Sequence, residues 1–451
     1  MTSRLYRRSS VRREIPVETI VAGTQVSNVI LYSLKEELHI NEIGYLASSL
    51  RGLRKQGTGI ILRCRETFPY MIPLLSEVDG IISPNTTSTA TVKGHAAEFC
   101  REEGKSLIVA DERTWRELEI YEGQNIFVDV RGQRIILVPD GQTAQKAISE
   151  DSPPGGIAEI ARLIQDGRHI SMLSTVPEPV RAEGKFSYFC RQEQLVMSSG
   201  RSPWDLLQLN QPDCERILHA VWSDYANKVQ PKLTVVFRSH DARSDEYPGS
   251  PIPHESNPQL GNHGPSLFES FEHLLEAEVA AITRLKAENP AKKIAYLLPF
   301  VRSKKEIIAA SAALNRALER AALPRNAVDL AVMYETPALP YLIEELQAAN
   351  VRTVWVGTKD LLMSFLMVDR DNPSPHLQDY LKLIDNKGEP NYAFIEYLRE
   401  NVSKFLNCGL EVVIYSLASE VPIFMQYLPE EVGFLISKGS VKEALTYLEI
   451  R

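Results

Sequence analysis

The chain has 451 residues, of which 44% are hydrophobic and 24% are charged; this balance is that of an ordinary soluble protein with about two or three domains. Its formal net charge of −8 argues against general binding to nucleic acid or to an anionic membrane. No apolar run approaches the roughly 20 residues that a membrane span needs. The five cysteines are scattered, so we expect a reducing cytoplasm, with no disulfide framework and no zinc site.

Residues 1–14 form a short tail that is rich in arginine. We expect a solvated, disordered extension, because no apolar stretch follows it as in a signal peptide. Residues 15–140 have the pattern of a small α/β domain, in which short apolar runs predict strands and Arg131-Gly132-Gln133 signals a hairpin. The predicted strands are 59–64, 78–82, 106–110, 125–130 and 134–138, and the predicted helices are 40–55 and 94–103.

The stretch 141–156 has the composition of a linker and includes Ser152-Pro153-Pro154-Gly155-Gly156, so we place a domain boundary there. From 157 to 451, strand-like and helix-like segments alternate, which favours a (β/α)8 barrel of the TIM type. A doubly wound sheet produces much of the same alternation. The predicted strands are 170–173, 186–189, 233–237, 294–298, 330–333, 353–356, 412–414 and 433–435, and the predicted helices include 157–165, 268–286, 304–320 and 392–405.

Charged residues follow five of the predicted barrel strands in turn. They are Arg191, Arg238, Arg302, Glu335 and Asp360. In such a barrel the carboxyl ends of the strands carry the ligand-binding side chains. Arginine suits phosphate and carboxylate groups, and two carboxylates from adjacent strands make an oxygen site suited to Mg²⁺. Any one of these charges could merely solvate the rim, but five with complementary signs favour a binding site.

His95 lies where a loop enters a predicted helix, in Thr91-Val92-Lys93-Gly94-His95-Ala96-Ala97. An imidazole at a helix N-terminus can hold a phosphoryl group, because the free N–H groups and the helix dipole favour an anion. Taken alone, the position favours a surface histidine that caps the helix poorly.

Several motifs together resemble one family. They are Gly94-His95-Ala96-Ala97, Phe189-Cys190-Arg191-Gln192-Glu193, Phe237-Arg238-Ser239, Glu255-Ser256-Asn257-Pro258-Gln259-Leu260-Gly261, Pro299-Phe300-Val301-Arg302 and Val368-Asp369-Arg370-Asp371-Asn372. With them, residues from about 15 to 451 resemble the phosphoenolpyruvate-utilising enzymes: pyruvate phosphate dikinase, phosphoenolpyruvate synthase and enzyme I of the sugar phosphotransferase system.

The resemblance implies a phosphohistidine swivelling domain, followed by a barrel that binds phosphoenolpyruvate or pyruvate and that forms a homodimer. It implies that His95 carries the phosphoryl group and that Glu335 and Asp360 hold Mg²⁺. It also assigns the phosphate and the carboxylate of the substrate to three arginines, Arg191, Arg238 and Arg370.

The chain departs from the family pattern at three positions in the barrel. His263 replaces an expected arginine, and Lys359 replaces an asparagine before the metal-binding aspartate. Tyr415 stands in place of the cysteine that protonates the enolate. We keep His263, Arg302 and Lys359 as candidates for substrate binding and Tyr415 as a candidate catalytic acid, although a tyrosine with an ordinary pKa near roughly 10 is a different acid from a thiol. Lys359 could also occupy the space of the metal.

Two functions follow from these observations. The first is a Mg²⁺-dependent phosphotransferase that uses phosphoenolpyruvate or a related 2-oxo acid. The length leaves no room for the nucleotide-binding domain of the dikinases or for the helical insertion of enzyme I, so the second half-reaction would need a separate nucleotide-binding or phosphocarrier protein. The second function is a diverged relative that acts as a scaffold or as a metabolite-sensing partner. Retention of Glu335 and Asp360 favours the first.

Overall fold

The computed structural model describes residues 13–21, 26–34, 40–54, 59–65, 67, 71–85, 95–129, 133–137, 156–177, 180, 185–247, 249–369, 374–385 and 389–450. The chain divides into two compact units, residues 1–152 and 153–451. The first strand begins at Arg13 and so takes in the last two residues of the predicted tail. Most of the predicted linker and the predicted site residue Arg370 lie outside the described residues.

The first unit is built on a mixed sheet with the strand order β1-β8-β7-β3-β4-β5-β6-β2. Strands β3 to β6 run parallel, and the outer pairs are antiparallel. The strands are β1 (Arg13–Pro16), β2 (Glu18–Val21), β3 (Val26–Ser33), β4 (Gly59–Arg63), β5 (Gly80–Pro84), β6 (Ser106–Ala110), β7 (Asn125–Asp129) and β8 (Arg134–Leu137). The helices are α1 (Ile40–Arg54), α2 (Ile72–Leu75), α3 (His95–Glu103), α4 (Glu112–Glu117) and the 3₁₀ helix Leu118–Tyr121.

The five strands and two helices predicted for this unit are confirmed, most of them to within two residues at each end. The hairpin is confirmed too, because β7 and β8 pair antiparallel with Asp129 opposite Arg134. Strands β1 to β3 were not predicted. β1 and β2 are short edge strands that pair only with the distant β8 and β6, so they lack the continuous apolar run that marks a buried strand.

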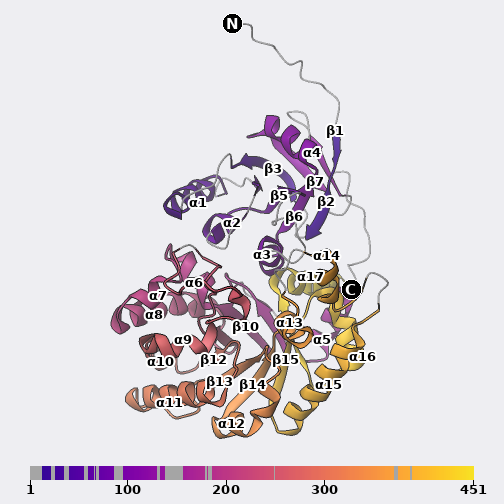
Figure 1. The fold of residues 1–451 in the computed structure, drawn as a ribbon. Coiled ribbons are helices and arrows are strands. Elements are labelled where there is room, and N and C mark those ends of the chain that lie inside the picture. The colour runs from indigo at the N-terminus through magenta and orange to yellow at the C-terminus, as the bar shows by residue number, and fades with distance from the viewer. Residues whose placement is uncertain are drawn as a thin grey trace. The chain divides into compact units, whose positions relative to one another are not determined.

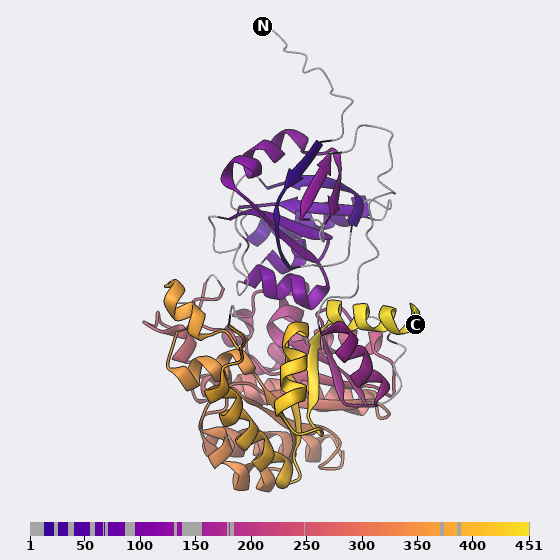
Figure 2. The ribbon, with the colours of Figure 1, turned by 90° about the vertical axis from the view of Figure 1, so that its right-hand side faces the viewer.

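The second unit is a closed barrel of parallel strands in the order β10-β11-β12-β13-β14-β15-β16-β9. Helices lie outside the strands (Figures 1 and 2). The strands are β9 (Ile170–Leu173), β10 (Phe186–Arg191), β11 (Thr234–Arg238), β12 (Lys293–Leu298), β13 (Asp329–Tyr334), β14 (Val351–Val356), β15 (Glu411–Tyr415) and β16 (Gly433–Ser437). All eight predicted strands are confirmed. Pairing of β16 with β9 closes the barrel and rules out a doubly wound sheet.

The α-helices of this unit begin with α5 and end with α17. They are α5 (Ile157–Gln165), α6 (Gln192–Ser198), α7 (Asp205–Gln208), α8 (Gln211–Lys228), α9 (Leu267–Ser270), α10 (Glu272–Glu288), α11 (Lys304–Arg320), α12 (Ile343–Ala348), α13 (Thr358–Leu366), α14 (Pro375–Tyr380), α15 (Tyr392–Asn407), α16 (Val421–Tyr427) and α17 (Lys438–Ile450). The predicted helix 268–286 is two helices, because Phe271 between them has φ −132° and ψ 61°, outside the helical region.

The interior of the barrel is a packed apolar core. Its buried residues come from all eight strands and include Phe189, Met333, Trp355 and Tyr415. Filling the interior in this way leaves the carboxyl ends of the strands as the place where a site can form. Among the residues that the structure describes, no helix is both long and apolar enough to cross a membrane.

Candidate active site

The predicted site residues of the barrel follow one another around its carboxyl end. Arg191 and Arg238 end β10 and β11 and stand opposite each other in register. Arg302 follows β12, Glu335 follows β13, Lys359 and Asp360 lie in the first turn of α13 after β14, and Tyr415 ends β15. Because neighbouring parallel strands end at the same edge, these residues are brought to one region. The arrangement that we predicted from strand order is therefore the one that the fold produces.

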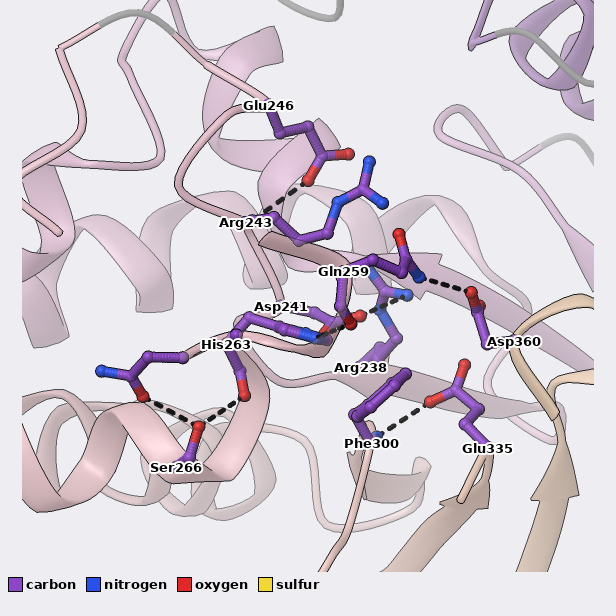
Figure 3. A network of polar contacts seen from close by, with 12 residues as sticks. Arg238, Asp241, Arg243, Glu246, Gln259, His263, Ser266, Phe300, Glu335 and Asp360 are labelled. Atoms are coloured by element: carbon purple, nitrogen blue, oxygen red, sulfur yellow. Dashed lines mark hydrogen bonds and ion pairs between the residues drawn. The ribbon is translucent and has the colours of Figure 1, made fainter. Parts of the chain in front are cut away.

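Arg238 belongs to a buried group of charges, which we call the arginine end of the site (Figure 3). Its Nη2 donates to Glu193 Oε2 at 3.1 Å, and its Nη1 lies 3.2 Å from Asp241 Oδ2. Burial alone would lower the pKa of Arg238, but the charges of Glu193 and Asp241 outweigh burial and raise that pKa. Burial would raise the pKa of Asp241, yet the Arg238 charge holds that pKa below its usual range. Glu193 and Asp241 therefore stabilise the buried charge of Arg238 and hold its guanidinium in place.

His263 is next to the arginine end and is almost fully buried. Its Nδ1 lies 2.8 Å from Asp241 Oδ1, and its Nε2 lies 3.0 Å from the Gln259 carbonyl oxygen and 3.2 Å from Arg302 Nη2. Both ring nitrogens therefore face protein atoms. The fold brings this predicted substrate-binding residue into the site, and it places the imidazole in an internal network.

Arg302 holds the loop that precedes α9. Its Nη2 donates to the Gly261 carbonyl at 2.9 Å and its Nη1 to the His263 carbonyl at 3.2 Å. The guanidinium also lies over the Phe300 ring, 4.5 Å from the ring centroid, a distance at which a cation is attracted to an aromatic face. Burial lowers the pKa of Arg302. The hydrogen bonds from Arg302 to the two carbonyls hold the loop around His263 in place.

Glu335 and Asp360 form the carboxylate end of the site. Glu335 is 3% exposed, and its Oε2 accepts a hydrogen bond from the Phe300 N–H at 2.8 Å. Phe300 provides this N–H from a left-handed backbone conformation with φ 44°, which is costly for a bulky residue and tends to occur at functional sites. Burial, and then the charge of Asp360, raises the pKa of Glu335 to about 8. This carboxyl is thus poorly neutralised by the protein.

Gly357, at the end of β14, gives Glu335 its space. A Cβ atom at this position would lie 2.5 Å from both Cγ and Oε1 of Glu335. No real Cβ approaches another atom so closely, so any larger residue would displace the carboxylate. The glycine is therefore part of what positions Glu335.

Asp360 is held by Gln259, a residue from the loop between β11 and α9. Gln259 Nε2 donates to Asp360 Oδ1 at 2.8 Å, and the side chain is 4% exposed. Figure 3 shows the amide between the arginine end and Asp360. Asp360 thus contacts a segment that is distant in the sequence.

The carboxylate end fits a divalent cation such as Mg²⁺. Two carboxylates interact there, one of them buried with a raised pKa, and a cation would favour its ionised form. No group of three or more His, Cys, Asp and Glu able to hold a metal occurs among the described residues. Mg²⁺ suits two carboxylates, because it keeps several waters and commonly binds substrate phosphates.

The remaining predicted residues lie near this end or in the first unit. Lys359 Nζ is 5.6 Å from the centroid of the Tyr415 ring, and Tyr415 is 8% exposed. The Thr358 hydroxyl donates to the Tyr415 carbonyl at 3.0 Å, which fixes the end of β15 against α13. His95 is the first residue of α3, as its predicted place at a helix N-terminus requires; its side chain lies outside the described part of the chain.

The comparison with protein families is decisive for this barrel. Residues 159–404, more than half of the chain, match the PEP-binding domain of the PEP-utilising enzymes. The chain belongs to the phosphoenolpyruvate-utilising enzymes. The fold and the order of the strand-end residues that the resemblance implied agree with this assignment.

Relatives of this chain include phosphoenolpyruvate synthases. The probable phosphoenolpyruvate synthase of Archaeoglobus fulgidus is 28% identical over 395 residues, which cover 85% of this chain and 48% of that protein. The phosphoenolpyruvate synthase of Pyrococcus furiosus is 26% identical over 376 residues, covering 81% of this chain and 43% of that protein. The chain thus spans about half the length of the curated relatives it matches.

The comparison with solved structures includes a distant likeness. The lead(II) complex of Haloferax volcanii malate synthase has a TM-score of 0.38 and 12% identity, over 62% of this chain and 72% of that chain.

Sequence reasoning missed three residues of the site: Glu193, Asp241 and Gln259. The first two follow the strand-end arginines by two and three residues, close enough that a search for opposite charges after each strand could have found them. Gln259 carries no such signal. Only the folded loop shows that its amide reaches Asp360.

Proposed function

We propose that this chain transfers a phosphoryl group from phosphoenolpyruvate, or from a related phosphorylated 2-oxo acid, at the carboxyl end of its barrel. The observation that carries this proposal is that one site has both an arginine end and a carboxylate end. Arginines on β10 and β11 stand in register, and a poorly neutralised carboxylate pair follows β13 and β14. A ligand with phosphate and carboxylate groups matches the first end, and a divalent cation matches the second.

In this proposal Arg191 and Arg238 bind the phosphate and carboxylate of the substrate, and Arg370 and Lys359 add positive charge. Arg238 is held in place by Glu193 and Asp241, so its guanidinium loses little freedom when the ligand binds. Glu335 and Asp360 would hold a Mg²⁺ ion, which would supply positive charge that stabilises the negative charge developing on the substrate. His263 and Arg302 act through the loop that they organise.

The phosphoryl transfer is proposed to go to His95. A ring nitrogen of His95 attacks phosphorus, an N–P bond forms, and the bond from phosphorus to the enol oxygen breaks. The electron pair passes to the enolate, and Tyr415 gives the proton of its hydroxyl to the methylene carbon, so that pyruvate leaves. Solvent then returns a proton to Tyr415. The second half-reaction uses a separate nucleotide-binding or phosphocarrier protein.

The test is intact-mass spectrometry at alkaline pH after incubation of the full chain with phosphoenolpyruvate and Mg²⁺. We expect the mass of one phosphoryl group to be added to the wild type and not to His95→Ala. A second sample, Tyr415→Phe, should form the phosphoprotein but release pyruvate more slowly, because only its proton donor is lost.

An unmodified wild type would contradict phosphoryl transfer from phosphoenolpyruvate. Calorimetry with phosphoenolpyruvate and Mg²⁺ would then separate the remaining functions. Binding that Glu335→Ala abolishes would favour a metabolite-sensing partner, whereas no binding would favour a scaffold. A homodimer through the barrel remains a prediction that the native mass in solution would test.

A further inference from the structure

Gln259 is the residue through which the loop after β11 reaches the carboxylate end. It lies in the short 3₁₀ helix Pro258–Leu260, about a hundred residues before Asp360 in the chain. Its Nε2 must be the atom that faces Asp360, because two oxygens at 2.8 Å would repel each other. This orientation leaves its Oε1 buried without a hydrogen-bond partner among the described residues.

Burying Gln259 Oε1 without a hydrogen-bond partner costs free energy. A buried acceptor without a partner costs on the order of 1–3 kcal/mol. A glutamine turned toward solvent, or an apolar residue of the same size, would avoid this cost. The Gln259 side chain nevertheless stays against Asp360. We therefore take its hydrogen bond to that carboxylate as the reason why a glutamine occupies this position.

Several hydrogen bonds hold the loop around Gln259. Glu255 accepts hydrogen bonds from the Asn262 N–H at 2.7 Å and from the Ser244 hydroxyl at 2.9 Å. Gly261 makes this possible, because a Cβ atom there would lie 2.3 Å from Glu255 Oε2. Arg302 Nη2 donates a hydrogen bond to the Gly261 carbonyl at 2.9 Å. The amide of Gln259 is therefore presented at a defined place.

The donor is also of the right kind for a cation site. An amide N–H orients a carboxylate and occupies one of its oxygens, but it carries no net charge. A lysine or an arginine in its place would neutralise the carboxylate and repel a metal ion. Glu335 likewise accepts a hydrogen bond from an uncharged donor, the backbone N–H of Phe300. Each carboxylate thus accepts a hydrogen bond from a neutral donor.

We infer that Gln259 is a positioning residue of the cation site, which aims Asp360 at a divalent cation through its bond to Oδ1. Gln259 also links this carboxylate to the arginine end. Its backbone carbonyl oxygen faces His263 Nε2, and His263 Nδ1 faces Asp241. The inference rests on the proposed function in requiring a cation at Glu335 and Asp360.

The experiment measures Mn²⁺ affinity of the full chain without substrate, by the electron paramagnetic resonance signal of free Mn²⁺. Gln259→Met keeps length and flexibility and removes the donor. We expect its Mn²⁺ affinity to fall about 10- to 100-fold, the usual loss when a metal ligand loses its supporting partner. Gln347→Met, in exposed α12 with its amide on the Cys408 carbonyl, is the matched control and should bind as the wild type does.

A double-mutant cycle distinguishes positioning from a general structural effect. When Asp360→Asn has already weakened binding, adding Gln259→Met should cause little further loss, because both act through the same carboxylate. A full additional loss in the double variant, or wild-type affinity in Gln259→Met, would overturn the inference while leaving the cation site intact. A wild type that binds no Mn²⁺ would instead overturn the cation site of the proposed function, and this inference with it.

Discussion

The two ends of the site use buried charge in opposite ways. At the arginine end, the carboxylates of Glu193 and Asp241 pair with Arg238, and the Arg238 charge lowers the pKa of Asp241. At the carboxylate end, Glu335 and Asp360 accept hydrogen bonds from the uncharged amides of Phe300 and Gln259. The pKa of Glu335 is raised to about 8.

The two ends therefore differ in whether the protein itself stabilises their buried charges. At the arginine end, Glu193 and Asp241 already stabilise the buried charge of Arg238 when no ligand is bound. A buried carboxylate beside a second one is unfavourable until a proton or a cation joins it. Removing a carboxylate from the arginine end is therefore expected to affect folding stability most, and removing one from the carboxylate end to affect cation binding most.

The largest effect is expected from Glu193→Ala, which removes the partner of Arg238 and of the Asp241 N–H. Removing one partner from a buried ion pair costs about 3–5 kcal/mol. Because Asp241 still faces Arg238 in this variant, the unfolding free energy of the barrel in urea should fall by about 3 kcal/mol, the lower end of that range. Glu276→Ala is the matched control. It breaks ion pairs with the exposed Arg316 and Arg320, which are worth about 1 kcal/mol or less. Equal losses in the two variants would refute the contrast between buried and surface pairs.

At the carboxylate end, Glu335→Gln should leave the fold intact, because an amide oxygen still accepts from Phe300. Its loss of charge should lower Mn²⁺ affinity by more than about 100-fold, beyond the range for supporting residues. Glu411→Gln is the control, since Glu411 begins β15 at the opposite end of the strand and contacts His169. If Glu335→Gln keeps wild-type affinity, this carboxylate does not bind the cation.

Cation binding should depend on pH through Glu335. Because its pKa is about 8, binding must displace a proton below that pH, and Mn²⁺ affinity should rise about tenfold per pH unit before levelling off above it. Without the cation, the folded state holds a proton that the unfolded state releases above 4.5, the ordinary pKa of the group. The contribution to stability therefore falls as pH rises from 4.5 to about 8. A flat affinity profile, or a slope that persists in Glu335→Gln, would contradict this assignment.

The smallest of these effects is expected from Gly357→Ala. The new Cβ would lie 2.5 Å from Glu335 Cγ and should push the carboxylate aside, with a loss in Mn²⁺ affinity of about tenfold. Gly52→Ala meets no atom within 4 Å and should change nothing at the site. A Gly357→Ala protein with unchanged affinity would mean that Glu335 can move without consequence.

Much of the barrel could be predicted from residue patterns. Short apolar runs mark buried strands, and the polar residue after each run marks the carboxyl end. Arg238, Glu335 and Asp360 were therefore placed in the right order around the barrel. The edge strands β1 and β2 were missed, because their pairing with β8 and β6 is not local.

The sequence by itself determined the family, the barrel and the residues at the ends of its strands, since each depends on patterns within a few residues. The tertiary structure alone decided how those residues are held. Gln259 meets Asp360, His263 turns toward Asp241, and Phe300 bends to reach Glu335 only when the barrel is closed. The first and third contacts join loops after different strands, the second joins distant parts of the segment between β11 and α9, and no local pattern encodes these distances.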